Sequence, residues 1–278
     1  MGFEGTELAV VPLDSEQARH PAVTGAKAAD LARAAAAGLP TLPGFVLVPV
    51  DRAPDAPIGE YSVRALWHEL RGDRIPLVVR SSSAHEDTED SSLADRIESV
   101  PDVRGWEQFK AAVGTVLDSA RGVRPPQPPE GDGIAVLVQP MLTSSVGGVL
   151  SGADPVEGRT DHILVSAVRG GPDQLVDGNT QRVRYRLTRM ARLVRTEPPG
   201  ERILSHRQRA RLVQLAKKAE RVFGGPQDME FGFDAHGKLW LLQARPITAT
   251  AARPAPGARL LDPGPVTEPL PGVLQPLE

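Results

Sequence analysis

Apolar and polar residues alternate in short blocks along the chain, and the spacing within each block predicts its secondary structure. Short apolar runs bounded by Pro, Gly or polar residues predict strands, whereas apolar residues spaced three and four apart predict helices. The expected strands are residues 8–13, 45–48, 76–80, 134–141, 147–155, 162–168, 182–187, 228–233 and 238–245. The expected helices are residues 24–37, 61–71, 105–120 and 205–222.

Helix caps and turn residues support this division of the chain. Thr24 and Ser205 stand where helices are expected to begin, because a hydroxyl there accepts a hydrogen bond from a free backbone amide. Gly38 is expected to end the first helix. Residues 234–237 are expected to form the turn of a hairpin between the last two strands. Helices and strands are mixed without strict alternation, which favours an α+β fold.

A proline-rich stretch, residues 121–133, interrupts the pattern near the middle of the chain. Because proline removes a backbone donor and restricts its neighbours, regular structure is not expected there. We therefore expect two lobes, residues 1–124 and 125–250. Residues 251–278 are rich in Pro, and we expect them to form an extended tail or linker.

Charge and composition exclude several classes of function. The net charge of −3 gives no electrostatic basis for binding nucleic acid or an anionic membrane surface. Aromatic residues make up 4% of the chain, too few for base-stacking platforms, and the absence of Cys excludes disulfides and thiolate sites. No apolar run approaches the roughly 20 residues of a membrane-spanning helix, and the N-terminus does not resemble a signal peptide. We therefore expect a cytoplasmic protein with no nucleic-acid and no membrane partner.

The first candidate for chemistry is Lys27, in the first turn of an expected helix. The helix dipole disfavours a cation at this position, but free amides at a helix start bind phosphate, and a bound anion would offset the cost. The alternative is a solvated surface lysine.

The second candidate is Arg80, where a buried strand opens into Ser81 and further serines. A guanidinium fork with hydroxyls and loop amides suits a polyphosphate. The alternative is a structural arginine that pairs with Glu86 or Asp87. The acidic run at residues 86–90 is expected to be a solvated loop.

The third candidate is the last hairpin. If its turn is centred on residues 235–236, Asp228 lies opposite Gln243, and Glu230 lies opposite Leu241. The alternation of a strand then places four polar side chains on one face, which are Asp228, Glu230, Gln243 and Arg245. Carboxylate and amide oxygens suit Mg²⁺ held between protein and phosphates. The alternative is a half-exposed hairpin with a cross-strand ion pair.

Five segments, in order along the chain, resemble the ATP-binding domain of the pyruvate, phosphate dikinase and phosphoenolpyruvate synthase family, which rifampin phosphotransferases share. The segments are residues 25–49, 78–94, 134–158, 164–178 and 224–248. The last segment, in which PQDMEF is followed by LLQARPIT, is quite specific. The resemblance covers nearly the whole chain to about residue 248. It implies an α+β, ATP-grasp-like fold whose two lobes hold ATP in a cleft between them.

The resemblance also implies roles for particular residues. Lys27, Arg80 and Arg245 correspond to phosphate-contacting residues that act in catalysis, and Glu230 and Gln243 correspond to metal ligands. The full set of expected nucleotide contacts is Lys27, Arg80, Ser81, Gln139, Pro140, Met141, Leu142, Asp228, Glu230, Gln243 and Arg245. Within this set, residues 139–142 correspond to the strand and hinge beside the adenine. The implied cofactors are ATP and Mg²⁺.

The family splits ATP to AMP and passes a phosphoryl group to a histidine on a swivelling domain, which delivers it to an acceptor. Neither His206, in the first turn of an expected helix, nor His85, in the serine-rich loop, fits that carrier. The resemblance therefore implies a phosphotransferase component whose histidine lies on another domain or subunit, with an acceptor that the sequence does not name.

Two departures from the family keep other functions open. Asp95 stands where the family usually has Gly, and Ser166 stands where it has a carboxylate. These changes favour a degenerate module that binds a nucleotide without turnover. A third possibility is an ATP-grasp ligase that forms an acyl phosphate. The nucleotide product distinguishes the three functions. A phosphotransferase component yields AMP when its partner is present, a degenerate module yields no product, and a ligase yields ADP when a carboxylate is present.

Overall fold

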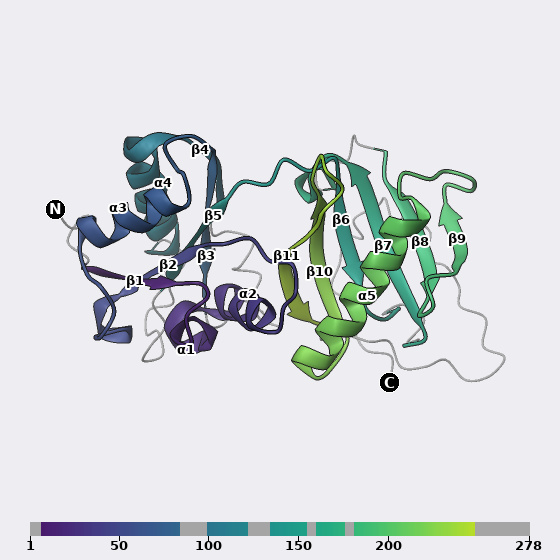
Figure 1. Cartoon of the computed structure of the whole chain (residues 1–278), viewed down its shortest axis with the longest axis horizontal. Coiled ribbons are helices and arrows are strands. Elements are labelled where there is room, and N and C mark those ends of the chain that lie inside the picture. Colours follow the sequence, from purple (N-terminus) through teal and green to yellow (C-terminus); the bar gives the residue numbers. More distant parts are fainter. Residues whose placement is uncertain (1–6, 84–98, 122–133, 155–159, 176–180, 248–278) are drawn as a thin grey trace, which may run out of the picture.

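The computed structural model describes residues 7–83, 99–121, 134–154, 160–175 and 181–247, which form two antiparallel sheets with helices packed against them (Figure 1). The strands are β1 (Leu8–Pro12), β2 (Phe45–Pro49), β3 (Leu77–Ser82), β4 (Ser99–Val103), β5 (Ala135–Pro140), β6 (Val146–Ser151), β7 (His162–Arg169), β8 (Val183–Thr188), β9 (Leu193–Glu197), β10 (Gln227–Phe233) and β11 (Leu239–Pro246). The first sheet has the order β1-β2-β5-β3-β4, and the second has the order β11-β10-β6-β7-β8-β9.

The helices are α1 (Pro21–Thr24), α2 (Ala26–Ala36), α3 (Glu60–Glu69), α4 (Gly105–Arg121) and α5 (His206–Phe223). Short 3₁₀ turns are η1 (Gln17–Arg19), η2 (Val50–Arg52) and η4 (Pro172–Leu175). The predicted mixture of helices and strands is therefore confirmed, and the class is α+β. None of the helices in the described ranges is both long and apolar enough to cross a membrane.

Helices cover both faces of the first sheet, which explains why β1 and β2 are continuous apolar runs rather than alternating ones. Phe45 packs edge-on against Phe109 of α4, with ring centroids 6.2 Å apart. The next residue along β2, Val46, points the other way and joins the cluster that contains Leu31 of α2. The sheet is thus held between α4 on one side and α2 on the other.

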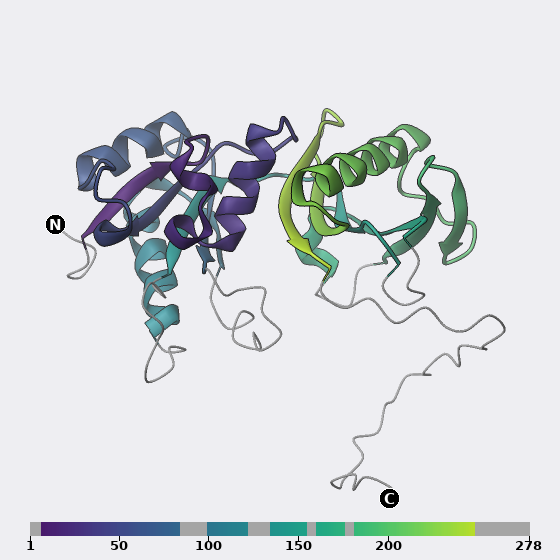
Figure 2. The ribbon, with the colours of Figure 1, turned by 90° about the horizontal axis from the view of Figure 1, so that it is seen from below.

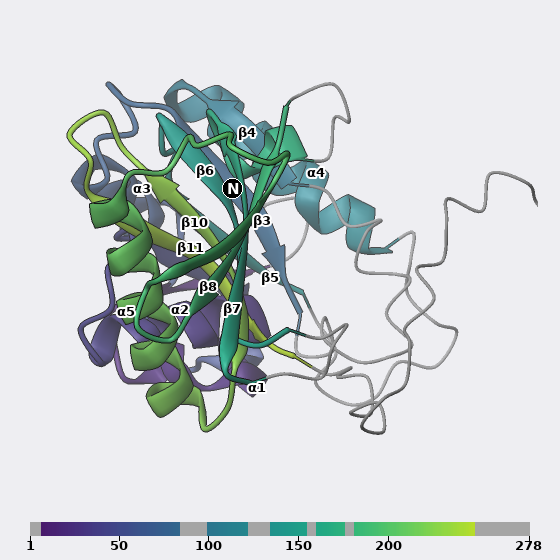
Figure 3. The same cartoon turned by 90° about the vertical axis from the view of Figure 1, so that its right-hand side faces the viewer.

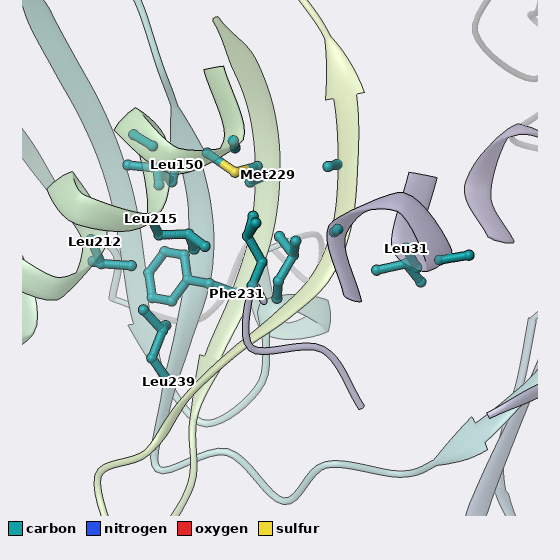
Figure 4. Close-up of a cluster of buried hydrophobic side chains, with 14 of the residues drawn as sticks. Leu31, Leu150, Leu212, Leu215, Met229, Phe231 and Leu239 are labelled. Atoms are coloured by element: carbon teal, nitrogen blue, oxygen red, sulfur yellow. The ribbon is translucent and has the colours of Figure 1, made fainter. Parts of the chain in front are cut away.

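The second sheet is covered by α5 on one face (Figure 3). The predicted cap at Ser205 is confirmed, because its hydroxyl accepts from the Gln208 amide while the Gln208 side chain bonds back to the cap. Gly224 ends the helix in the left-handed conformation. Leu212 of α5 and Phe231 of β10 are fully buried in one apolar cluster with residues of α2, β6 and β11 (Figure 4).

The helix predicted from Thr24 to residue 37 is divided in two. Thr24 is the last residue of α1, and its hydroxyl donates to the Ala18 carbonyl over 2.8 Å, so the predicted cap is wrong. Gly25, with φ of 78°, stands at the N-cap of α2 instead. The predicted stop at Gly38 agrees with its φ of 72° just beyond the helix.

The chain passes from the first sheet to the second after β5, whereas the expected boundary between residues 124 and 125 lies outside the described residues. β5 pairs with β2 and β3 of the first sheet, because its apolar side chains fill that core. The proline-rich stretch therefore precedes the last strand added to the first sheet. Most of that stretch, the acidic run at residues 86–90 and the tail at 251–278 lie outside the described residues.

The loop after α2 ties the two sheets together. The Leu241 amide of β11 donates to the Pro40 carbonyl over 2.7 Å, and Thr41 forms a parallel bridge with Leu241. The guanidinium of Arg33 on α2 lies 5.0 Å from the ring centre of Phe223 at the end of α5. In the view of Figure 2, α2 accordingly stands beside β11.

Candidate functional site

Arg80 reaches from the first sheet to the hairpin of the second. One terminal nitrogen of its guanidinium donates to Gln243 Oε1 over 2.8 Å and lies 3.9 Å from Glu230 Oε2. The other donates to the Leu242 carbonyl over 3.2 Å. The Arg80 side chain is only 14% exposed, whereas the Glu230 side chain is 40% exposed and remains open to solvent. Three residues that the sequence placed in one site therefore meet, although they lie up to 163 positions apart.

Lys27 lies next to the same strand. Its ammonium donates to the carbonyl of Ser81, the residue after Arg80, over 3.1 Å. Ser81 itself is buried. The start of α2 and the end of β3 are thus in direct contact, which brings the two predicted phosphate-binding segments together.

The start of α2 is closed by β3, contrary to the expectation of free amides at this helix end. The Ala26 amide donates to the Ser83 carbonyl over 2.8 Å, and the Ala28 amide donates to Ser82 Oγ over 3.0 Å. The contact requires glycine at position 25, where a Cβ atom would lie 2.3 Å from the Ser82 carbonyl oxygen. These two amides therefore hold β3 and are not available to a phosphate.

The hairpin of β10 and β11 has a different register from the predicted one. Asp228 pairs with Arg245, and Glu230 pairs with Gln243, so both predicted pairings are wrong. Part of the reason is the turn, which is one residue longer than expected because the Asp234 amide bonds to the Lys238 carbonyl. The rest is a register shift between Glu230 and Phe231, which leaves one extra residue on β11.

That extra residue is Leu242, and it decides which side chains share a face. Leu239 and Leu241 are buried under α5, and strict alternation would turn Gln243 to the same side. The bulge reverses the alternation, so that Ala244 is buried instead. Gln243 and Arg245 therefore share the outer face with their partners on β10, as the sequence pattern predicted.

The segment predicted to lie beside the adenine joins the two sheets. Gln139, at the end of β5, is buried and donates to the Leu42 carbonyl over 3.1 Å, and Pro140 ends the strand. Met141 is 39% exposed, and its amide donates to the Pro76 carbonyl. The chain then continues through Leu142 toward β6.

Leu142 lies against Gly232 of β10. A Cβ atom added to Gly232 would be 2.6 Å from a methyl group of Leu142. Sequence reasoning missed Gly232, although an isolated glycine in a strand pattern indicates a close approach. It also missed the Leu242 carbonyl, whose only signal is the pair of adjacent leucines at 241 and 242 that breaks the alternation.

Ser166, the position that lacks the expected carboxylate, lies in the same row of the sheet. Ser166 pairs with Val149, Val149 pairs with Glu230, and Glu230 pairs with Gln243. At a strand spacing of about 4.8 Å, Ser166 lies roughly 10 Å from Glu230 along this row. The departure therefore falls within the candidate site, whereas Asp95 lies outside the described residues.

The oxygen donors of Glu230 and Gln243 fit a Mg²⁺ ion that is shared with a nucleotide, and they are too few to hold a metal by themselves. Glu230 and Gln243 are neighbours and offer a carboxylate and an amide oxygen, which are hard ligands of the kind Mg²⁺ takes. No group of three or more His, Cys, Asp or Glu side chains suited to a metal occurs within the described ranges. A metal here would complete its coordination with phosphate oxygens and water.

A model of the pyruvate phosphate dikinase AMP/ATP-binding domain family matches residues 60–197 and 181–259, which together exceed half of the chain. The chain belongs to this family. Membership in the pyruvate phosphate dikinase AMP/ATP-binding domain family, with the two-sheet α+β architecture, confirms the predicted ATP-grasp-like fold class. The match identifies the chain as an AMP/ATP-binding module of this family.

Curated relatives include a probable phosphoenolpyruvate synthase from Archaeoglobus fulgidus, 30% identical over 65% of this chain and 28% of the relative. An uncharacterized phosphotransferase from Bacillus subtilis, YvkC, is 28% identical over 66% of this chain and 25% of the YvkC chain. The prodigiosin synthesizing transferase PigC of Serratia marcescens is 27% identical over 88% of this chain and 34% of PigC. The chain thus spans about a quarter to a third of the length of these relatives.

Solved structures that resemble the chain include the D-alanine-D-alanine ligase from Coxiella burnetii, with a TM-score of 0.41, 16% identity, and coverage of 78% of this chain and 45% of that one. The biotin carboxylase domain of the Hydrogenobacter thermophilus 2-oxoglutarate carboxylase has a TM-score of 0.44 and 16% identity. That match covers 80% of this chain and 39% of the carboxylase chain.

Proposed function

We propose that the chain is the Mg²⁺·ATP-binding component of a phosphotransferase of the phosphoenolpyruvate synthase type. It would donate a phosphoryl group from ATP to a histidine carried on another domain or subunit. One observation carries this proposal, namely that Arg80 of the first sheet meets Glu230 and Gln243 of the second. A cation and metal-type oxygens at one point between two lobes are what a triphosphate with its metal requires.

In this proposal, the cations Lys27, Arg80 and Arg245 neutralise the charge that the phosphates develop during transfer. Glu230 and Gln243 would hold Mg²⁺, which would offset the negative charge of the phosphates. Ser81 and Asp228 lie beside these groups, as the residue after Arg80 and the strand partner of Arg245. Residues 139–142, which join the two sheets, contact the adenine.

Calorimetric titration of Mg²⁺·ATP into the wild type, Arg80→Ala and Arg74→Ala tests the site. Loss of a charge-assisted phosphate contact should weaken binding by at least about 1–3 kcal/mol, or roughly 5- to 150-fold, in Arg80→Ala. Arg74 has a 70% exposed side chain near the start of the same strand, so Arg74→Ala controls for the loss of a charge and should bind as the wild type does. Equal affinity in all three proteins would remove Arg80 from the site.

The nucleotide product tests the reaction. The chain mixed with ATP and a swivelling histidine domain from a relative should produce AMP, an acid-labile phosphohistidine and inorganic phosphate, because ATP loses two phosphoryl groups, of which histidine takes one and water the other. ADP formed with a carboxylate substrate would indicate a ligase instead.

A degenerate module that binds ATP without turnover is the second candidate, and Ser166 favours it. Ser166 lies in the row of Glu230 and Gln243, where the family has a carboxylate. If this loss limits turnover, Ser166→Glu should increase AMP formation with the histidine domain. The conservative Ser166→Ala variant provides the control and should not.

A further inference from the structure

A cavity of about 600 Å³ lies on the opposite face of the second sheet from the candidate nucleotide residues. Its walls come from the turn after α2, the middle of α5 and the hairpin turn between β10 and β11. The volume falls within the range of small-molecule pockets. None of the predicted nucleotide contacts lines this cavity, so it is a separate feature of the molecule.

The side chains around the cavity are basic. Arg211 and Lys218 of α5 and His236 and Lys238 of the hairpin line it, and no Asp or Glu is among the described lining residues. This excess of positive charge contrasts with the net charge of −3 of the whole chain. No carboxylate in the described part of the chain forms an ion pair with Arg211, Lys218 or Lys238.

Two of these cations are held in place by neighbouring groups. A terminal nitrogen of Arg211 donates to the Gly237 carbonyl over 2.7 Å. The ammonium of Lys238 lies 3.7 Å from the centre of the Trp240 ring, and alternation along β11 puts that ring on the face opposite Leu239 and Leu241, so this charge lies outside the cavity. Holding the Arg211 charge in position lowers the entropy lost when an anion binds.

The acidic residue of the same turn, Asp234, is engaged within the turn. Its Oδ1 accepts from the amides of His236 and Lys238, and its Oδ2 accepts from Trp240 Nε1. These hydrogen bonds use the carboxylate to fix the turn that carries the two basic side chains. The cavity therefore has a structured wall, to which Arg211 is tied through the Gly237 carbonyl.

The floor of the cavity is apolar. Leu215 of α5 and Leu239 of β11 are buried there, with Pro40 and Ala210 beside them. A purely inorganic anion would leave this surface without a partner. We propose that the cavity binds an organic anion, in which a carboxylate, sulfonate or phosphate is attached to an apolar or ring-shaped body.

The position of the cavity gives such a ligand contact with both halves of the molecule. Gly38 and Pro40 follow α2, whereas Lys238 and Leu239 belong to the hairpin, whose Leu241 amide bonds to Pro40. A ligand here stabilises the contact between the loop and the hairpin. The 11 residues of α2, about 16 Å long, separate it from Lys27.

The test uses the whole 278-residue chain and the fluorescent organic anion 8-anilinonaphthalene-1-sulfonate. We expect saturable binding at one site, and a dissociation constant at least about tenfold weaker in the double variant Arg211→Gln/Lys218→Gln. Lys217→Gln is the matched control, since Lys217 is the neighbouring lysine on α5 and does not line the cavity. Circular dichroism melting curves check that each variant is folded.

Three outcomes would overturn the proposal. The first is an unchanged dissociation constant in the folded double variant. The second is competitive displacement of the probe by Mg²⁺·ATP, which would place the probe in the nucleotide site. The third is equal displacement by sulfate and by benzenesulfonate, because the apolar floor predicts that benzenesulfonate competes at a much lower concentration.

Discussion

Gly25 fixes the start of α2 against β3 through its own backbone. Its φ of 78° and ψ of 163° lie in a region that residues with a Cβ atom rarely occupy, and the Ser82 carbonyl fills the space beside it. Gly38 also has a positive φ, of 72°, but a Cβ atom at that position would have no other atom within 4 Å. A substitution at Gly38 therefore tests backbone strain alone, whereas a substitution at Gly25 tests backbone strain together with a steric clash.

We predict that Gly25→Ala lowers the free energy of unfolding by about 3 kcal/mol, because it adds a clash with β3 to the strain. Gly38→Ala should cost about 1–2 kcal/mol, from strain alone. Urea unfolding of both variants measures the difference. Equal losses would mean that β3 moves aside without cost.

Asp234 is predicted to titrate below its ordinary pKa of 3.8, chiefly because Trp240 donates a hydrogen bond to it, with smaller contributions from the amides of Lys238 and His236. A lowered pKa in the folded state stabilises the fold at pH values above 3.8. That contribution is lost as the pH falls through the lowered value. Carboxyl NMR titration should show the pKa of Asp234 moving back toward 3.8 in Trp240→Phe, and an unchanged pKa would contradict the assignment.

At the scale of elements, the hairpin of β10 and β11 depends on a single inserted residue. Deleting Leu242 should remove the bulge and place Gln243 directly after Leu241, so that regular alternation keeps Gln243 and Arg245 on the outer face. We predict that this deletion weakens Mg²⁺·ATP binding in calorimetry without abolishing it, because Arg80 loses the Leu242 carbonyl that it contacts while Gln243 stays opposite Glu230. The control is Leu242→Ala, which keeps the bulge and the carbonyl that Arg80 contacts, and it should retain binding.

The sequence predicted the elements well where one local signal decides them. Ser205 marked the start of α5, and the apolar runs located nine of the eleven strands in the described residues. β4 and β9 were missed, because their sequences are short and largely polar or charged. It failed at Thr24 and at the hairpin register, because those depend on contacts with distant residues. A hydroxyl before a helix predicts a cap, but Gly25 holds that place since only glycine fits beside Ser82.

The same limit applied to the candidate site. The sequence indicated that Arg80, Glu230 and Gln243 belong together, yet it held no sign that the arginine would also bind a strand carbonyl. The bulge and the length of the turn each shifted the register by one position, and neither has a strong local signal. Their combined effect restored the face on which the prediction rested.

At the scale of the whole molecule, one apolar cluster extends across both sheets. It includes Val46 of the first sheet, Leu31 of α2 and Phe231 of the second sheet. The two lobes should therefore unfold together and not as independent domains.

We predict that Leu31→Ala, which empties a fully buried position, lowers the free energy of unfolding by about 2–5 kcal/mol. Tryptophan fluorescence and far-UV circular dichroism should report one coincident transition, because Trp67 and Trp106 lie with the first sheet and Trp240 with the second. Two separate transitions would show that the cluster does not couple the lobes.

The bridge between Thr41 and Leu241 has a consequence for the protein in a crowded solution. β11 is an edge strand, and exposed edges invite strands of other molecules to add to the sheet. The loop after α2 covers part of this edge, and the opposite edge, β9, carries the charged side chains of Arg195 and Glu197. The loop after α2 therefore also hinders the pairing of β11 with a strand of a second molecule.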